Sequence, residues 1–304
     1  GGIPQSWKPV TRAGFRELAG WRQRQLVEEL RKPLPYKFPH KDVEPVADID
    51  SVDWSSCVGA QRSDAGSEGI LFVELAGRKA VCLKCPQKVA AEMWGTMLCQ
   101  RLSLCCPQMR IVSRASEEGA LIIASLSALD ADKPEHEREV SALLGRSPYA
   151  LLVIEYLRGV ELADIFPPCS EDWSQRVFGL PSDKSGGGGL SDAGRRILRF
   201  LGALVAFDMM VNNFDRLPCI WNNGGNPGNV MFIMDRYPVS IDNMVCCIDH
   251  PEALSSFLCA VKSAVCAVAA APEREHPEFS RIRQFLRDGC PVGAGGTGHG
   301  WAGL

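Results

Sequence analysis

Several classes of protein are excluded by what the sequence lacks. The 304 residues carry a net charge of −3, so the chain has no basic footprint for nucleic acid. We expect no signal peptide at the start, and no apolar run of the about eighteen residues that a membrane span requires. The 13 cysteines are odd in number and scattered through apolar segments. This usage indicates reduced thiols in the cytoplasm rather than a disulfide scaffold.

Short metal and phosphate motifs are incomplete as well. Cys82 and Cys85 form a Cys-x-x-Cys pair, but no second pair and no set of histidines stands at zinc-ligand spacing. The four glycines 186–189 are not followed by Gly-Lys-Ser/Thr, which indicates a flexible linker and not a phosphate loop. A structural zinc site and a P-loop are therefore not expected.

Polar residues instead concentrate in one short stretch, 208–242. Asp215 is followed by a polar loop that ends at Asn229, and residues 230–242 have the pattern of a hairpin. Because a hairpin returns the chain to its starting point, Asp242 is expected beside Asn229, with Asp215 just upstream. Such oxygen ligands suit Mg²⁺ with a phosphate group, and one Asp could orient an attacking hydroxyl. Each residue alone could simply shape a surface turn, but their order favours a nucleotide-phosphate site.

An upstream lysine has the position expected of a phosphate ligand. Residues 69–84 have the pattern of two strands joined by a tight turn, and alternation places Cys82 and Lys84 on one face. The second strand resembles the Val-Ala-Ile-Lys strand of kinases, with Cys82 in place of the small residue under the adenine. The helix expected over 88–104 carries Glu92 in its first turn, where it could pair with Lys84 after a sharp turn. An exposed strand-end lysine is the ordinary alternative.

A small-residue loop precedes this hairpin. After a strand expected around 54–61, the chain contains Gly66, Ser67 and Gly69. These residues would let backbone N–H groups approach the phosphates of a nucleotide. The run is not Gly-x-Gly-x-x-Gly, so its position is the stronger part of the argument.

A second segment could contact the base. The apolar run that begins at Tyr149 predicts a buried strand, and it ends in Glu155, Tyr156 and Leu157. This ending is similar to a kinase hinge, in which backbone groups near Glu155 and Leu157 would bind the adenine edge. An ordinary core strand explains the apolar part equally well.

The central stretch resembles a known family. Asn212-x-x-Asp-Arg-Leu-Pro, the loop from Trp221, and Asn229-Val-Met-Phe are similar to the catalytic domain of the actin-fragmin kinase family. That family has an outlying protein-kinase-like fold related to the phosphoinositide kinases, and the resemblance covers about residues 50–290. The interval from Asn229 to Asp242 also resembles the metal-binding stretch of phosphoinositide 3- and 4-kinases.

The resemblance implies a role for each central residue. Asp215 would be the catalytic aspartate, Lys84 the phosphate lysine, and Asn229 and Asp242 the metal ligands, with ATP and Mg²⁺ as cofactors. The loop from Asp215 to Asn229 is longer than in ordinary kinases, and no Phe-Gly follows Asp242. Asp249 is a second candidate for the metal aspartate, but its interval from Asn229 does not fit the short hairpin.

The predicted fold class is α+β, a bilobal protein-kinase-like fold with a strand-rich N-lobe and a mainly helical C-lobe. Residues 1–50 are expected to form an N-terminal brace, and residues 51–158 the N-lobe as far as the hinge. Residues 159–304 would form the C-lobe, with an insertion over 166–195 and a loose tail over 289–304. The brace contains an expected helix over 11–30, and buried helices are expected over 195–211 and 251–271.

The resemblance implies a serine/threonine protein kinase that acts on actin, or on a complex of actin with a severing protein. A phosphoinositide-type lipid kinase is the first alternative, although no polybasic loop follows Asp242 to hold an anionic headgroup. An inactive kinase-like binding module is the second, and the presence of all four central residues disfavours it. Residues 243–250 contain no Ser, Thr or Tyr, so control by phosphorylation of this segment is not expected.

Overall fold

A computed structural model of the chain describes residues 37–63, 69–134, 138–162, 192–221, 225–233, 237–272 and 277–287. From Phe38 onward these residues belong to one compact unit. The helix expected over 11–30, Gly66, Ser67, most of the insertion 166–195 and the tail 289–304 lie outside the described residues.

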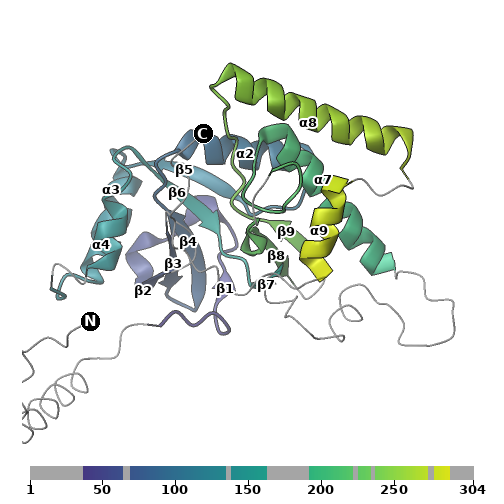
Figure 1. The fold of residues 1–304 in the computed structure, drawn as a ribbon. Coiled ribbons are helices and arrows are strands. Elements are labelled where there is room, and N and C mark those ends of the chain that lie inside the picture. Colours follow the sequence, from purple (N-terminus) through teal and green to yellow (C-terminus); the bar gives the residue numbers. More distant parts are fainter. Residues whose placement is uncertain are drawn as a thin grey trace, which may run out of the picture. The chain divides into compact units, whose positions relative to one another are not determined.

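Among the described residues, the larger of two sheets has six strands (Figure 1). They are β1 Glu44–Pro45, β2 Cys57–Arg62, β3 Ile70–Leu75, β4 Lys79–Lys84, β5 Met109–Ser113 and β6 Ala150–Glu155. The order is β2-β3-β4-β6-β5 with antiparallel neighbours, and β1 pairs in parallel with the first residues of β4. The predicted hairpin of β3 and β4 is therefore confirmed; Gly77 in its turn has a φ of 72°, which glycine adopts without strain.

The two faces of this sheet bury different clusters, as alternation predicts. Val81 and Leu83 face a core that includes Ile122 and Leu126 of α3 (Glu117–Ala128) and residues of α4 (Glu139–Leu144). Ala80 and Cys82 face the opposite way, toward Val89 and Met93 of α2 (Val89–Arg101). The predicted alternation along β4 is confirmed, and Lys84 lies at the end of the α2 side.

The start of the first long strand differs from the prediction. Residues 54–61 were expected to be extended, but Trp54–Ser56 form a 3-10 turn and β2 begins at Cys57. The Asp53 side chain accepts a hydrogen bond from the Ser55 N–H and caps this turn. Trp54 is buried, and its indole N–H donates to Glu118, so tertiary packing overrides the strand pattern here.

The smaller sheet consists of β7 (Gly159–Glu161), β8 (Val230–Ile233) and β9 (Tyr237–Ser240), in that order. The predicted hairpin is confirmed, with Val230 opposite Ser240. Two further 3-10 turns occur at Ile49–Ser51 and Pro227–Asn229. Helix α7 (Asp192–Val211) contributes a line of buried apolar residues to the core beside this sheet: Ile197, Leu201, Leu204, Val205 and Phe207. Helix α9 spans Pro277–Arg287.

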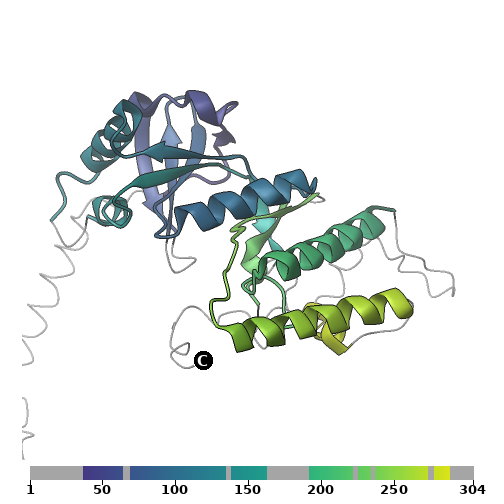
Figure 2. The same cartoon turned by 90° about the horizontal axis from the view of Figure 1, so that it is seen from above.

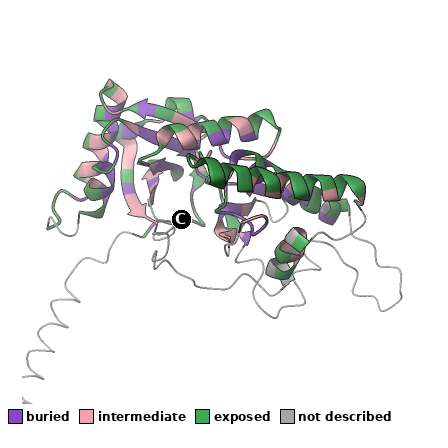
Figure 3. Ribbon diagram, turned by 45° about the horizontal axis from the view of Figure 1, so that its top comes forward, coloured by how far each residue is buried: buried purple, intermediate pink, exposed green. Residues whose placement is uncertain are grey.

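Helix α8, Pro251–Ala270, is correctly placed but its predicted burial is wrong. It runs beside α7 (Figure 2), and only Ala264 is buried, so most of its surface is exposed in Figure 3. Its apolar character comes largely from Ala, Val, Cys and Leu, with Glu252 and Lys262 as its two charged residues. The expectation of no membrane-length apolar run is also wrong, since α8 is long and apolar enough, by length and composition, to cross a membrane. One such helix is weak evidence for a span.

Candidate active site

Lys84 lies between two carboxylates. Its Nζ is 2.8 Å from Oε1 of Glu92 and 2.8 Å from Oδ1 of Asp242, and its side chain is only 12% exposed. Burial by itself would lower the pKa of Lys84, but the charges of Asp242 and Glu92 outweigh this effect and raise it. The lysine is therefore a fixed cation at neutral pH. The expected proximity of Glu92 to Lys84 is present.

A close backbone contact holds α2 in this position. A Cβ on Gly95 would lie 2.4 Å from the carbonyl oxygen of Asn243, so only glycine lets α2 approach the segment after Asp242. One turn earlier, the Ala91 carbonyl accepts a hydrogen bond from the Val245 N–H at 3.1 Å. The helix that carries Glu92 and the segment that carries Asp242 are thus joined directly.

The end of α7 delivers Asp215. Asn212 has a φ of 54°, and the Asn213 N–H donates to the Asp208 carbonyl at 2.9 Å, which is the Schellman arrangement that ends a helix. Asn213 then accepts a bond from the Asp215 N–H through its side chain. Burial, followed by the charge of Asp242, raises the pKa of Asp215, while hydrogen bonds from Asn226 and Asn229 oppose the rise.

Asn229 contacts Asp215 directly. Its Nδ2 donates to the Asp215 carbonyl oxygen at 2.5 Å and lies 3.4 Å from Oδ2 of the same residue. The Ile241 N–H donates to the Asn229 carbonyl at 3.0 Å, which fixes the start of the hairpin beside its end. Because the amide nitrogen faces Asp215, the amide oxygen is the atom that could bind a cation.

Asp242 has an uncommon backbone conformation. Its φ is 54°, in the left-handed region that non-glycine residues seldom adopt and that occurs preferentially at functional sites. Its side chain is 41% exposed although it pairs with Lys84. Among the described residues, no three His, Cys, Asp or Glu side chains converge as metal ligands. One carboxylate and one amide oxygen nevertheless fit Mg²⁺, which takes its other ligands from water and substrate phosphates.

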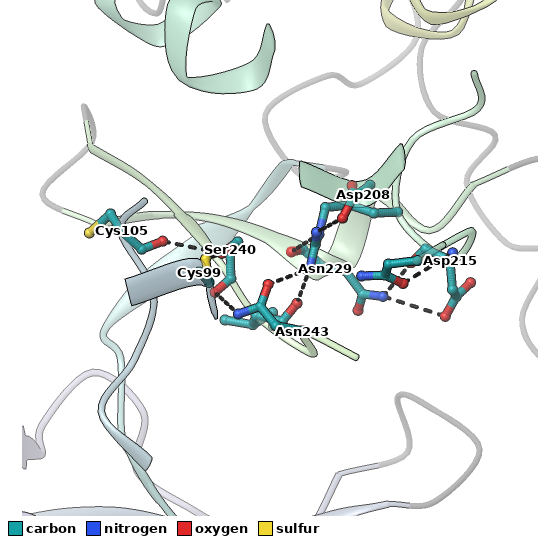
Figure 4. A network of polar contacts seen from close by, with 10 residues as sticks. Cys99, Cys105, Asp208, Asp215, Asn229, Ser240 and Asn243 are labelled. Atoms are coloured by element: carbon teal, nitrogen blue, oxygen red, sulfur yellow. Dashed lines mark hydrogen bonds and ion pairs between the residues drawn. The ribbon is translucent and has the colours of Figure 1, made fainter. Parts of the chain in front are cut away.

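Arg216 organises the site from beneath, a role that sequence reasoning missed. It is fully buried and pairs with Asp208. It also donates to Oδ1 of Asn243 at 2.7 Å, and to the backbone carbonyl oxygens of Ile241 at 2.9 Å and Asn229 at 3.3 Å. Figure 4 shows Asp208, Asn229 and Asn243 around one centre, with Asp215 to the side. One guanidinium thus connects the segments on which Asp215, Asn229 and Asp242 stand.

The residues predicted to surround the adenine base are more buried than expected. Cys82 is buried, and burial raises the pKa of its thiol to about 12, so it is a neutral core residue. The Glu155 N–H donates to the Gln108 carbonyl at 2.9 Å, and its side chain accepts from the Gln108 N–H. Tyr156 is buried and Leu157 is half-buried. The Glu155 N–H, one of the groups predicted to bind the adenine edge, is therefore already engaged within the protein.

Two other candidates are placed differently. Gly69 has a φ of 76°, as a glycine in a phosphate-binding turn could, while Gly66 and Ser67 lie outside the described residues. Asp249 is exposed at the start of α8, and within the described part of the chain no hydrogen bond or ion pair joins it to Lys84, Asp215 or Asn229. Asp242, which pairs with Lys84, remains the candidate metal ligand.

Comparisons with known proteins identify a family. The family described as "Actin-fragmin kinase, catalytic" matches residues 38–288. A Dictyostelium discoideum protein named "Putative actin-fragmin kinase" is 26% identical over 254 residues, covering 79% of this chain and 56% of that protein. The match therefore spans little more than half of the relative's length. Since the family match covers most of the sequence, the chain belongs to the actin-fragmin kinase catalytic-domain family.

Proposed function

We propose that the chain is an ATP- and Mg²⁺-dependent protein serine/threonine kinase. The observation that carries the proposal is the ion pair of Lys84 with Glu92 and Asp242, next to the bonded pair of Asp215 and Asn229. Lys84 would hold phosphate oxygens, and Asn229 and Asp242 would hold the metal, which neutralises phosphate charge. Family membership supports a kinase in general; the acceptor amino acid and the cofactors belong to the proposal.

Asp215 has the properties of the residue that receives the substrate hydroxyl. The buried Arg216 pairs with Asp208 and not with Asp215. The raised pKa of Asp215 makes its carboxylate a better proton acceptor than that of an ordinary aspartate. The hydroxyl oxygen would form a bond to the γ-phosphorus while the bond from the γ-phosphorus to the bridging oxygen breaks. The hydroxyl proton passes to Asp215, and ADP leaves.

The same proposal includes a two-lobed arrangement. The six-stranded sheet with α2 would form the N-lobe, and α7, α8 and the β7–β9 sheet would belong to the C-lobe. Residues 155–157 would be the hinge between them. Eleven free cysteines in the described part of the chain support a reducing, cytoplasmic location.

Actin, alone or with a severing protein, is the proposed substrate, because the name of the family and of the Dictyostelium relative refers to it. The test is transfer of labelled γ-phosphate from Mg-ATP to three acceptors: actin, actin bound to a severing protein, and phosphoinositide vesicles. Phosphoserine or phosphothreonine on actin, lost with Asp215→Asn, is expected. Label on lipid alone would indicate a lipid kinase, and nucleotide binding without transfer would indicate a binding module.

A further inference from the structure

The face of β4 that carries Lys84 is covered by residues that precede the first strand. Phe38 is 1% exposed and packs against side chains from β4, β6 and the residue after β6: Ala80, Cys82, Leu152, Ile154 and Tyr156. Its ring centroid lies 5.4 Å from that of Phe72 and 5.4 Å from that of Tyr156. An aromatic side chain from residues 38–43 therefore fills the sheet surface beside the lysine.

A nucleotide held by Lys84 has one direction in which its base can extend along this face. Beyond Lys84 the chain turns into α2, where Glu92 occupies the flank of the lysine. In the other direction Cys82 and Ala80 follow at two-residue intervals, about 6.7 Å each along a strand. The base would lie over Cys82, whose direct partner on β3 is Phe72, and this is the surface that Phe38 covers.

Contacts that involve side chains hold the covering segment in place. The Phe38 N–H donates to the Gln61 side chain at 2.5 Å, and the Tyr156 hydroxyl donates to the His40 carbonyl at 3.2 Å. Beyond it, β1 pairs with β4 only at Lys79 and Ala80. Asp42 also pairs with Arg78 at 3.5 Å, His40 Nδ1 lies 3.2 Å from the Tyr156 hydroxyl, and Val43 is fully buried. Each of these contacts involves a side chain and none is a strand pairing, so the segment can leave without breaking the six-stranded ladder.

We propose that residues 38–43 are a built-in competitor of the adenine base, with Phe38 as the competing ring. The inference rests on the proposed nucleotide site at Lys84. While the segment is closed, only the open fraction of molecules can bind the base, so the apparent affinity for nucleotide falls by that fraction. A contact that draws residues 38–43 away from the sheet would activate the enzyme.

Phe38→Ala tests the proposal through binding of Mg-ADP and Mg-ATP to the full chain by calorimetry. Removal of the competing ring should lower the dissociation constant about tenfold or more. The matched control is Leu126→Ala, which truncates a fully buried residue of α3 in the core on the opposite face of the same sheet. That variant also loses core packing, but its nucleotide affinity should stay unchanged. Equal or weaker nucleotide affinity of Phe38→Ala would overturn the proposal and indicate that the Phe38 ring is part of the binding site.

A second variant keeps the test decisive if Phe38→Ala does not fold. Gln61→Met removes the acceptor of the Phe38 N–H and leaves the ring in place, so affinity should rise by a smaller factor, about threefold. In the wild-type chain, amide hydrogen exchange at residues 38–43 should become faster when Mg-ATP is added. Slower exchange at residues 38–43 would contradict the proposal that they compete with the base. If neither the wild type nor any variant binds nucleotide, the proposed function itself fails, which is a different outcome.

Discussion

Two aspartates seven residues apart show how differently two regions of the candidate site are built. Asp208 is buried in α7, pairs with Arg216, and shares that guanidinium with Asn243 and two backbone carbonyls. Asp215 belongs to the exposed side, next to Asn229 and within the field of Asp242. We call the first group the buried frame and the second, with Lys84, the reactive layer. The frame should determine stability, and the reactive layer should determine turnover.

This difference follows from where charge is compensated. In the frame, Asp208 and Arg216 compensate each other out of contact with water, so removal of one leaves the other buried and unpaired. In the reactive layer, Asp215 and Asp242 are like charges; Lys84 compensates Asp242, and the remaining repulsion on Asp215 falls when a further cation or a proton arrives. This arrangement of charges would favour metal binding and proton transfer at the proposed site, while the frame fixes the backbone segments that carry it.

The largest expected effect is on turnover in the reactive layer. Asp215→Asn should lower kcat by about three orders of magnitude or more, because it removes the proton acceptor and the orientation of the hydroxyl. Binding of Mg-ATP should change little, since Asp215 is not assigned to metal or phosphate. Single-turnover phosphorylation and a separate nucleotide titration measure the two parts. A parallel loss of binding would place Asp215 among the ligands instead.

The largest effect on stability is expected in the frame. Arg216→Met should lower the free energy of unfolding by about 3–5 kcal/mol, because the Asp208 carboxylate remains buried without its partner. Urea denaturation measures the loss. The double variant Arg216→Met with Asp208→Leu removes both charges and should recover much of it. If the single variant were as stable as the wild type, the frame would not have the role assigned to it.

A smaller effect tests the junction between the regions. Gly95→Ala forces a Cβ to within 2.4 Å of the Asn243 carbonyl, so α2 must shift; the expected cost is about 1–3 kcal/mol, with reduced kcat. Gly202→Ala is the matched control, since a Cβ at this exposed position of α7 meets nothing within 4 Å. It should stabilise the chain by about 0.5–1 kcal/mol. Equal effects of the two substitutions in melting experiments would contradict the close packing at Gly95.

The smallest effect concerns pH. The pKa of Asp215 is raised in the folded protein, so the ionised form costs stability that is regained only on protonation. Asp215→Asn should therefore raise Tm modestly at pH 7, and the gain should vanish below the unfolded pKa of 3.8. For the same reason the acidic limb of kcat/KM should lie above the ordinary range for aspartate. A variant that is less stable than the wild type at pH 7 would contradict a raised pKa of Asp215 in the folded protein.

Local patterns sufficed to predict the reactive layer. Alternation along 79–84 placed Lys84 on the correct face, and the turn after 230–233 indicated that Asp242 returns beside Asn229, as the pairing of Val230 with Ser240 shows. Both inferences depend on short-range periodicity, which a single sequence contains. The resemblance to the family added the roles that these residues are proposed to have.

The frame and the helix surfaces could not be predicted in this way. Arg216 looks like an ordinary surface arginine, because its partners Asp208, Ile241 and Asn243 come together only in the folded chain. The apolar sequence of α8 predicted burial, but nothing in a sequence states which helix lies at the edge of the unit. The contact between Phe38 and Cys82 is likewise long-range, so the periodicity of the sequence cannot predict it.

The most direct test of the nucleotide site is the Mg-ATP-dependent rise in Tm of three proteins: the wild type, Asp242→Asn and Asp249→Asn. Ligand that binds only the folded state raises Tm with concentration. The wild type and Asp249→Asn should show equal rises that disappear when Mg²⁺ is chelated, and Asp242→Asn should show little rise. No rise in the wild type at millimolar Mg-ATP, or a loss confined to Asp249→Asn, would contradict the account.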